Sequence, residues 1–138
     1  MTQYEKDLLL KDLCARLPYG VKVRYSSYEK FITCTLQAID YVYNNVDLWS
    51  KDACFNPVNI SKIKPYLFPL SCMTKEQKEE LDKYLDMDSK SLIDGYKNGL
   101  KCAHPYFNVQ DWYNKNHFDY RCLISMGLAI DATGLNIY

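Results

Sequence analysis

The sequence predicts an α+β protein with an N-terminal helix, a small curled antiparallel sheet of the SH3-like or meander kind, and C-terminal helices packed on it. Apolar residues recur at every second position before residues 62–74 and at every third or fourth position after them. These are the periods of a half-buried strand and of an amphipathic helix. Pro65 and Pro69 lack an amide hydrogen and disfavour helix before them, so an extended segment is expected to end there. We expect one domain, 1–138, with a helix at 1–18, a β part at 19–69 and a helical part at 74–131.

The first helix is expected from about residue 3 to about residue 16. Thr2 and Glu5 match a capping box, in which a hydroxyl and a carboxylate each satisfy a backbone amide at a helix start. Leucines then follow helical spacing, and Asp12 and Arg16 are expected largely away from their stripe. Pro18 is expected to end the helix.

The β part is expected to hold several short strands, beginning where Val21, Val23 and Tyr25 alternate with polar residues. The apolar phase shifts near Gln37, which predicts a bulge. Asn44 with Asn45 predicts a hairpin turn, because Asn tolerates left-handed backbone angles. The remaining elements are expected to be a returning strand with Val46, Leu48 and Trp49, a loop over 50–57, and a last strand with Val58, Ile60 and Ile63.

The helical part is expected to begin at Thr74, which matches a second capping box with Gln77. Further helices are expected around 88–99 and around Trp112, and a last one from Asp119. The last helix would carry a core-facing stripe, and the tail to residue 138 is expected to be frayed. The stripe is Tyr120, Leu123, Ile124, Gly127 and Leu128. The seam between the β part and the helical part is expected to hold Tyr66, Leu67, Phe68 and Leu70.

Composition limits the function classes. Seventeen basic and seventeen acidic residues cancel, which excludes the global positive field of most nucleic-acid binders. No run approaches the roughly 18 apolar residues of a membrane helix, and the N-terminus does not fit a signal peptide, so a cytoplasmic protein is expected. The six cysteines are then expected to be reduced, and most of them buried.

The chain is rich in tyrosine, with 13 Tyr and 14% aromatic residues. Tyrosine packs its ring and keeps a hydroxyl at the boundary, which favours a surface that docks a protein. In the other interpretation, tyrosine replaces Leu and Phe at the core margin. The candidate binding residues are Tyr66, Phe68, Trp112, Tyr113, His117, Tyr120 and Arg121.

A nucleic-acid site is the first alternative. Basic residues interleaved with aromatics on a curled sheet would suit a single strand, by phosphate neutralisation and base stacking. Such residues also occupy strands for solubility alone. The candidates are Lys22, Arg24, Lys62 and Lys64.

A small enzyme is the second alternative, because His117, Asp119 and Arg121 could build a proton-transfer or anion site. Helix capping and surface pairing explain the same residues. Cys102, His104, His117 and Cys122 do not have the usual spacing of zinc ligands, so no metal and no cofactor are expected.

Three segments resemble a family of short uncharacterised proteins from gut bacterial genomes, prophages and mobile elements. They are Leu8–Val23, Lys64–Thr74 with the motif KPYLFPLS-x-MT, and the tail with the motif HFDYR-x-LI. The resemblance leads us to expect Ser where Cys72 stands and Gly where Cys122 stands. It implies a phage or mobile-element setting and no mechanism.

These observations together favour a non-enzymatic intracellular binding module, an adaptor or inhibitor that docks a protein. The sequence leaves its partner and its oligomeric state open.

Overall fold

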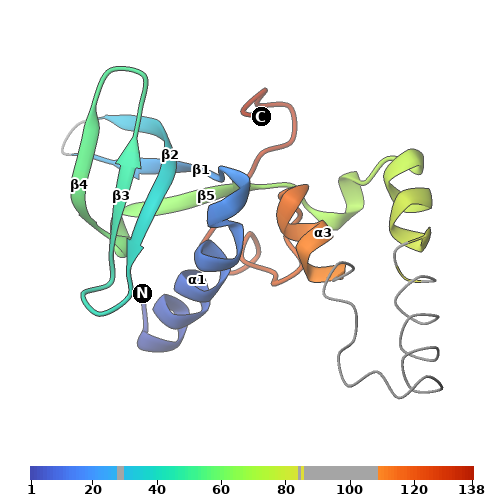
Figure 1. Cartoon of the computed structure of the whole chain (residues 1–138), viewed down its shortest axis with the longest axis horizontal. Helices are drawn as coiled ribbons and strands as arrows, with labels where there is room; N and C mark the ends of the chain where they lie inside the picture. The colour runs from blue at the N-terminus through green and yellow to red at the C-terminus, as the bar shows by residue number, and fades with distance from the viewer. Residues whose placement is uncertain (28–29, 84, 86–108) are drawn as a thin grey trace, which may run out of the picture.

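The computed structural model describes residues 1–27, 30–83, 85 and 109–138. Its strands are β1 (Lys22–Ser26), β2 (Phe31–Asp40), β3 (Asn45–Trp49), β4 (Cys54–Asn59), β5 (Ile63–Leu67) and β6 (Ile130–Asp131). Its helices are α1 (Gln3–Arg16), residues 75–83 and α3 (Val109–Lys115), with 3₁₀ turns η1 (Leu17–Tyr19), η2 (Ile60–Lys62) and η3 (Leu70–Cys72). The sheet lies at one end of the molecule and helix 75–83 at the other, with α1 and α3 between them (Figure 1).

The described strands form one six-stranded sheet in the order β4-β3-β2-β1-β5-β6. All neighbours pair antiparallel except β5 and β6, which are parallel. The predicted α+β class is therefore confirmed, and β1 to β4 form a meander. The finer expectation of an SH3-like barrel is not confirmed.

Helix α1 begins and ends as its sequence predicts. Thr2 Oγ1 accepts from the backbone N of Glu5, and the Glu5 carboxylate accepts from the backbone N of Thr2, so the capping box is complete. The expectation that Asp12 and Arg16 lie away from the leucine stripe is wrong, because both side chains are fully buried. Positions 9, 12, 13 and 16 share one helical face.

The β2–β3 pair contains the predicted bulge, where the register shifts between Leu36 and Ala38. Asn44 has φ of 54°, as expected for its turn. Strand β2 ends at Asp40, whose carboxylate accepts from the backbone N of Val42 and of Tyr43 and closes the turn.

The expected loop over 50–57 is wrong, since β4 begins at Cys54. Pro57 is tolerated because β4 is an edge strand and because the register with β3 shifts between Val46 and Leu48, which leaves residues 56–57 unpaired. The expected last strand is also divided, because Ile60 lies in η2 and only Ile63 begins β5.

The proline-containing segment lies at the seam between the sheet and the helices. Pro65 pairs with Val23 inside the sheet, and β5 ends at Leu67, before Pro69. Tyr66 and Leu67 are buried, whereas Leu70 is 42% exposed and does not pack at the seam as expected.

The helical part is only partly as predicted. Thr74 and Gln77 cap helix 75–83 with the two reciprocal hydrogen bonds of a capping box. Trp112 lies in α3. The helix expected around 88–99 lies outside the described residues.

The helix expected from Asp119 is wrong, because residues 119–129 form turns that lead into β6. Cys122 and Gly127 have φ of 60° and 71°, left-handed values that interrupt a right-handed helix. The Asp119 carboxylate instead accepts from the backbone N of Leu123 and of Ile124, at 2.8 Å each.

The main core lies between α1, the inner face of the sheet and these turns. Leu123 and Leu128 of the expected stripe are buried there, although they are not helical. A second cluster of Leu81, Trp112 and Phe118 links helix 75–83, α3 and the segment after it. The remaining buried apolar residues of the main core are Leu9, Leu10, Leu13, Val21, Val23, Cys34, Leu36, Val46, Leu48, Val58, Ile60, Ile63, Leu67 and Ala129.

Candidate functional site

The aromatic residues singled out in the sequence gather at the seam and are mostly inside it. Tyr66, Trp112 and His117 are at most 8% exposed. Trp112 stacks on Phe118 with ring centroids 5.6 Å apart, and Phe68 packs against the same phenyl ring. Tyr113 and Tyr120, both half-buried, stack on one another at 5.3 Å. The burial of these rings shows that they hold the helical segments together.

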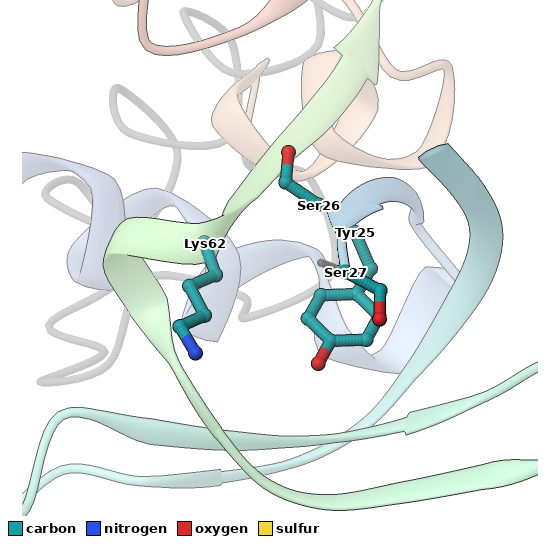
Figure 2. A pocket seen from close by; sticks show the side chains of 4 residues that line it. All are labelled: Tyr25, Ser26, Ser27 and Lys62. Atoms are coloured by element: carbon teal, nitrogen blue, oxygen red, sulfur yellow. The ribbon is translucent and has the colours of Figure 1, made fainter. Parts of the chain in front are cut away.

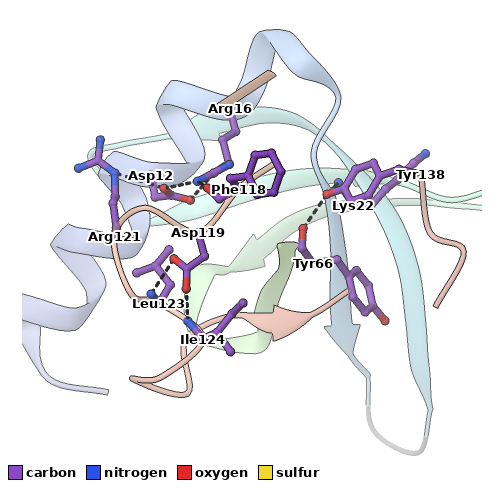
Figure 3. A network of polar contacts seen from close by, with 10 residues as sticks. All are labelled: Asp12, Arg16, Lys22, Tyr66, Phe118, Asp119, Arg121, Leu123, Ile124 and Tyr138. Atoms are coloured by element: carbon purple, nitrogen blue, oxygen red, sulfur yellow. Dashed lines mark hydrogen bonds and ion pairs between the residues drawn. The ribbon is translucent and has the colours of Figure 1, made fainter. Parts of the chain in front are cut away.

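His117, Asp119 and Arg121 each have a structural partner, and Figure 3 shows those of Asp119 and Arg121. The imidazole of His117 stacks on the ring of Tyr138, with centroids 3.9 Å apart. Both Asp119 oxygens are taken by backbone amides, and the Arg121 guanidinium pairs with Asp12 at 3.2 Å. Packing, backbone hydrogen bonds and ion pairing therefore account for all three side chains, and no hydrogen bond or ion pair of the described residues joins these side chains to one another.

Burial and, as the smaller cause, the positive charge of Arg16 together lower the pKa of His117 from 6.5 to about 4. The imidazole is therefore neutral near pH 7. Its Nδ1 is buried and has no hydrogen-bond partner among the residues that the structure describes.

A buried charged network underlies the seam, and sequence reasoning missed it. Arg16 Nε donates to Asp12 Oδ2 at 2.7 Å, and its Nη2 donates to the carbonyl oxygen of Phe118 at 2.8 Å. Arg121 approaches the second oxygen of the same carboxylate. The i, i+4 spacing of Asp12 and Arg16 within the leucine stripe was the available signal.

The C-terminal segment is docked, contrary to the expected fraying. The Tyr138 hydroxyl accepts from the backbone N of Lys22 at 3.1 Å and donates to the carbonyl oxygen of Tyr66 at 2.7 Å. Ala132 N donates to the carbonyl oxygen of Leu67. Burial raises the pKa of Tyr138 to about 12. The tail therefore fastens β1 to β5.

Three of the four basic candidates lie on the outer face of the sheet, the side opposite α1. Arg24 is directly opposite Lys64 in the β1–β5 pair, and Lys22 is two residues along the same face. These three residues are called the basic patch below. Lys62 does not join it, because it lies in η2.

Lys62 lines a small pocket of about 170 Å³ with Tyr25, Ser26 and Ser27 (Figure 2). A second pocket of about 300 Å³ lies between η3, α3 and the tail, and its lining includes Phe68, Cys72 and Thr133. Small-molecule sites usually have about 300 to 1,000 Å³ and convergent polar groups. The first pocket is below that range and the second is at its lower limit.

Three consecutive large apolar side chains are exposed at one turn of the described sheet, which was not singled out in the sequence. Tyr41, Val42 and Tyr43, called the hairpin tip below, are 69%, 78% and 71% exposed. The tip joins β2 to β3. The signal in the sequence was the Tyr-Val-Tyr triplet directly before the Asn pair.

The cysteines do not follow the expectation of general burial. Among the described cysteines only Cys34 is buried, and all five are unpaired. The described residues contain no group of three or more His, Cys, Asp or Glu arranged to hold a metal ion. Cys102 and His104 lie outside the described residues.

Comparison of the chain with protein-family models, curated proteins and solved structures finds no match. No helix in the described part of the chain is long and apolar enough to cross a membrane. The fold and its sites therefore define an α+β protein whose function must be inferred from its own surface.

Proposed function

We propose that this chain is a non-enzymatic cytoplasmic binding module that docks a protein partner through the hairpin tip, as an adaptor or inhibitor. The observation that carries the proposal is the exposure of three consecutive large side chains, Tyr41, Val42 and Tyr43. Clustered exposed apolar residues are typical of interaction sites, and tyrosine is enriched among residues that dominate binding energy.

The backbone of the tip is held in place from both sides. The Asp40 carboxylate accepts the amides of Val42 and Tyr43 at 3.0 and 3.2 Å. The carbonyl oxygen of Asn44 accepts from Ile60 N at 3.0 Å, which ties the turn to η2. A fixed turn loses little conformational entropy on binding, so these contacts preorganise the tip for a partner.

The buried aromatic candidates support this proposal indirectly. Tyr66, Trp112 and His117 are used inside the seam, which leaves partner contact to aromatics elsewhere. The family resemblance adds a phage or mobile-element setting, in which a small adaptor or inhibitor would act on host machinery.

The test is affinity capture from a host-cell lysate with three forms of the protein. Wild type, the tip variant Tyr41→Ser/Val42→Ser/Tyr43→Ser and the control Met126→Ser/Leu135→Ser are compared, because Met126 and Leu135 are also exposed, at 37% and 48%. The proposal requires a protein captured by wild type and control and lost with the tip variant. Equal capture by all three forms, or by none, contradicts it.

A further inference from the structure

We propose that the outer face of the sheet binds single-stranded nucleic acid, with the basic patch on the phosphates and Phe31 as a stacking platform. This function is separate from docking at the hairpin tip and does not depend on it. It rests on how strand register arranges charge and one aromatic ring.

Register places the basic patch in two adjacent rows. In one row Lys64, Arg24 and Thr33 are direct cross-strand neighbours from β5, β1 and β2. In the next row Lys22 is opposite Thr35, which is opposite Trp49 of β3. Neighbouring strands are about 4.8 Å apart, so three cations lie within a few strand spacings on one surface.

Phe31 lies beside this patch and is open to solvent. It is 71% exposed and pairs with Ser26 at the end of β1. The Arg24 guanidinium lies over its ring, 4.5 Å from the centroid. An exposed ring next to cations is the combination that single-strand binders use, because every base can stack and every phosphate can be neutralised.

The side chains of the patch are partly positioned before any ligand binds. Lys22 Nζ donates to Thr35 Oγ1 at 2.7 Å, and Arg24 Nε is buried without a hydrogen-bond partner among the described residues. The carboxylates of β2 and β3 on this face, Asp40 and Asp47, lie beyond the bulge, toward the hairpin tip. The two rows that hold Lys22, Arg24 and Lys64 therefore contain three cations and no acidic residue on the described strands, in a chain of zero net charge.

The chemistry favours a single strand over a duplex. The described face is a sheet surface with exposed rings, Phe31 and Trp49, which offers stacking that the bases of a duplex cannot use. An acidic protein could meet the same cations, and it would have no need of Phe31.

The test is fluorescence anisotropy with a labelled oligothymidine of about 16 nucleotides, the upper site size of small single-strand folds. Three phosphate contacts predict a slope of about −2 for log affinity against log salt, so affinity should fall about 100-fold for a tenfold rise in salt. Arg24→Gln/Lys64→Gln should reduce the slope to about −0.7, and Phe31→Ala should weaken binding about 5- to 150-fold.

The matched control is Lys78→Gln/Lys83→Gln, which removes two positive charges from exposed residues of helix 75–83, at the other end of the molecule (Figure 1). It should bind as wild type does, and circular dichroism checks that all variants are folded. No binding at low salt overturns the proposal, as does an equal loss in the control. Binding of poly-glutamate as tight as that of the oligonucleotide, with no effect of Phe31→Ala, overturns it in favour of an acidic protein.

Discussion

The hydroxyl of Tyr138 is 2.7 Å from the carbonyl oxygen of Tyr66 and 3.1 Å from the backbone N of Lys22. Lys22 and Tyr66 are the next pair along the β1–β5 register after Val23 and Pro65. A side chain from the C-terminal segment thus takes the place of a ladder hydrogen bond between two strands. The C-terminal segment therefore stabilises the pairing of β1 with β5.

Tyr138→Phe should therefore destabilise the protein by about 1 to 3 kcal/mol, because it leaves a backbone donor and a backbone acceptor without their partner. Urea unfolding measures the difference. The control is Tyr43→Phe, whose ring is 71% exposed and whose change should stay within about 0.5 kcal/mol. Equal effects of the two substitutions would show that the two hydrogen bonds of the Tyr138 hydroxyl contribute nothing to the free energy of unfolding.

The same hydroxyl predicts a loss of stability at high pH. Burial raises the pKa of Tyr138 from 10.0 to about 12. Below pH 10 the group is neutral in both states, and as pH rises from 10 toward 12 the unfolded chain loses a proton that the folded chain keeps. Stability should fall across this window, and Tyr138→Phe should flatten the fall. An unchanged profile in the variant contradicts the assignment.

His117 predicts a second window, at acid pH. Its pKa is lowered from 6.5 to about 4 by burial and by the charge of Arg16. The contribution of neutral His117 to the free energy of unfolding is fully present above pH 6.5. It is lost as pH falls toward 4, because the unfolded chain takes up a proton that the folded chain excludes. The loss is on the order of 3 kcal/mol.

His117→Asn should remove this acid dependence, because the amide of Asn does not titrate in this range. Asn also tolerates the left-handed φ of 56° at this position. Urea unfolding at several pH values measures it, and an NMR titration of the imidazole gives the pKa directly. A pKa near 6.5 in the folded protein would be inconsistent with the stacked, buried ring.

Asp12→Asn should cost about 3 to 5 kcal/mol, because it leaves the buried Arg16 without its carboxylate. The comparison is Glu79→Gln, which breaks an exposed pair with Lys75 at 3.9 Å and should cost at most about 0.5 kcal/mol. Thermal and urea unfolding report both. A cost for Asp12→Asn as small as that of the control would mean that the network does not hold α1 to the seam.

Gly127→Ala distinguishes the turn from the helix that its sequence suggests. A Cβ at Gly127 meets no atom within 4 Å, so its cost is backbone strain at φ of 71°. We expect a loss of about 1 to 2 kcal/mol. In a helix the same substitution would stabilise the protein. The sign of the change in the free energy of unfolding, measured by urea unfolding, therefore distinguishes the turn from a helix, and Met126→Ala is the control at the neighbouring position.

The periodic elements could be predicted from the sequence because their signals are local. The capping boxes at Thr2 and Thr74 and the bulge after Leu36 follow from short-range hydrogen bonding and side-chain alternation. The division between an extended and a helical half at the prolines is likewise local.

The remainder depends on tertiary contacts that no local pattern shows. The apolar residues after Asp119 have helical spacing, but the left-handed backbone at Cys122 and Gly127 makes this segment a series of turns. Leu123 and Leu128 are buried from these turns. A glycine at position 122 would adopt that angle without a Cβ. Asp12 and Arg16 pair with each other one helical turn apart, but their burial also depends on Arg121 and on the carbonyl oxygen of Phe118, which are more than a hundred residues away.

The site candidates divide in the same way. Of the four basic candidates, Lys22, Arg24 and Lys64 share one face through the β1–β5 register, and Lys62 does not, because it lies in η2. The aromatic content of the sequence does not distinguish the buried Trp112 from the exposed Tyr43. Exposure is a property of the fold.

The most direct test of the proposed docking function is a photo-crosslinking amino acid at position 42, with position 135 as the matched exposed control. After irradiation in the host cell, mass spectrometry identifies the crosslinked proteins. Docking through the hairpin tip predicts a discrete crosslinked partner from position 42 that position 135 does not give. The same products from both positions, or none from position 42, would contradict it.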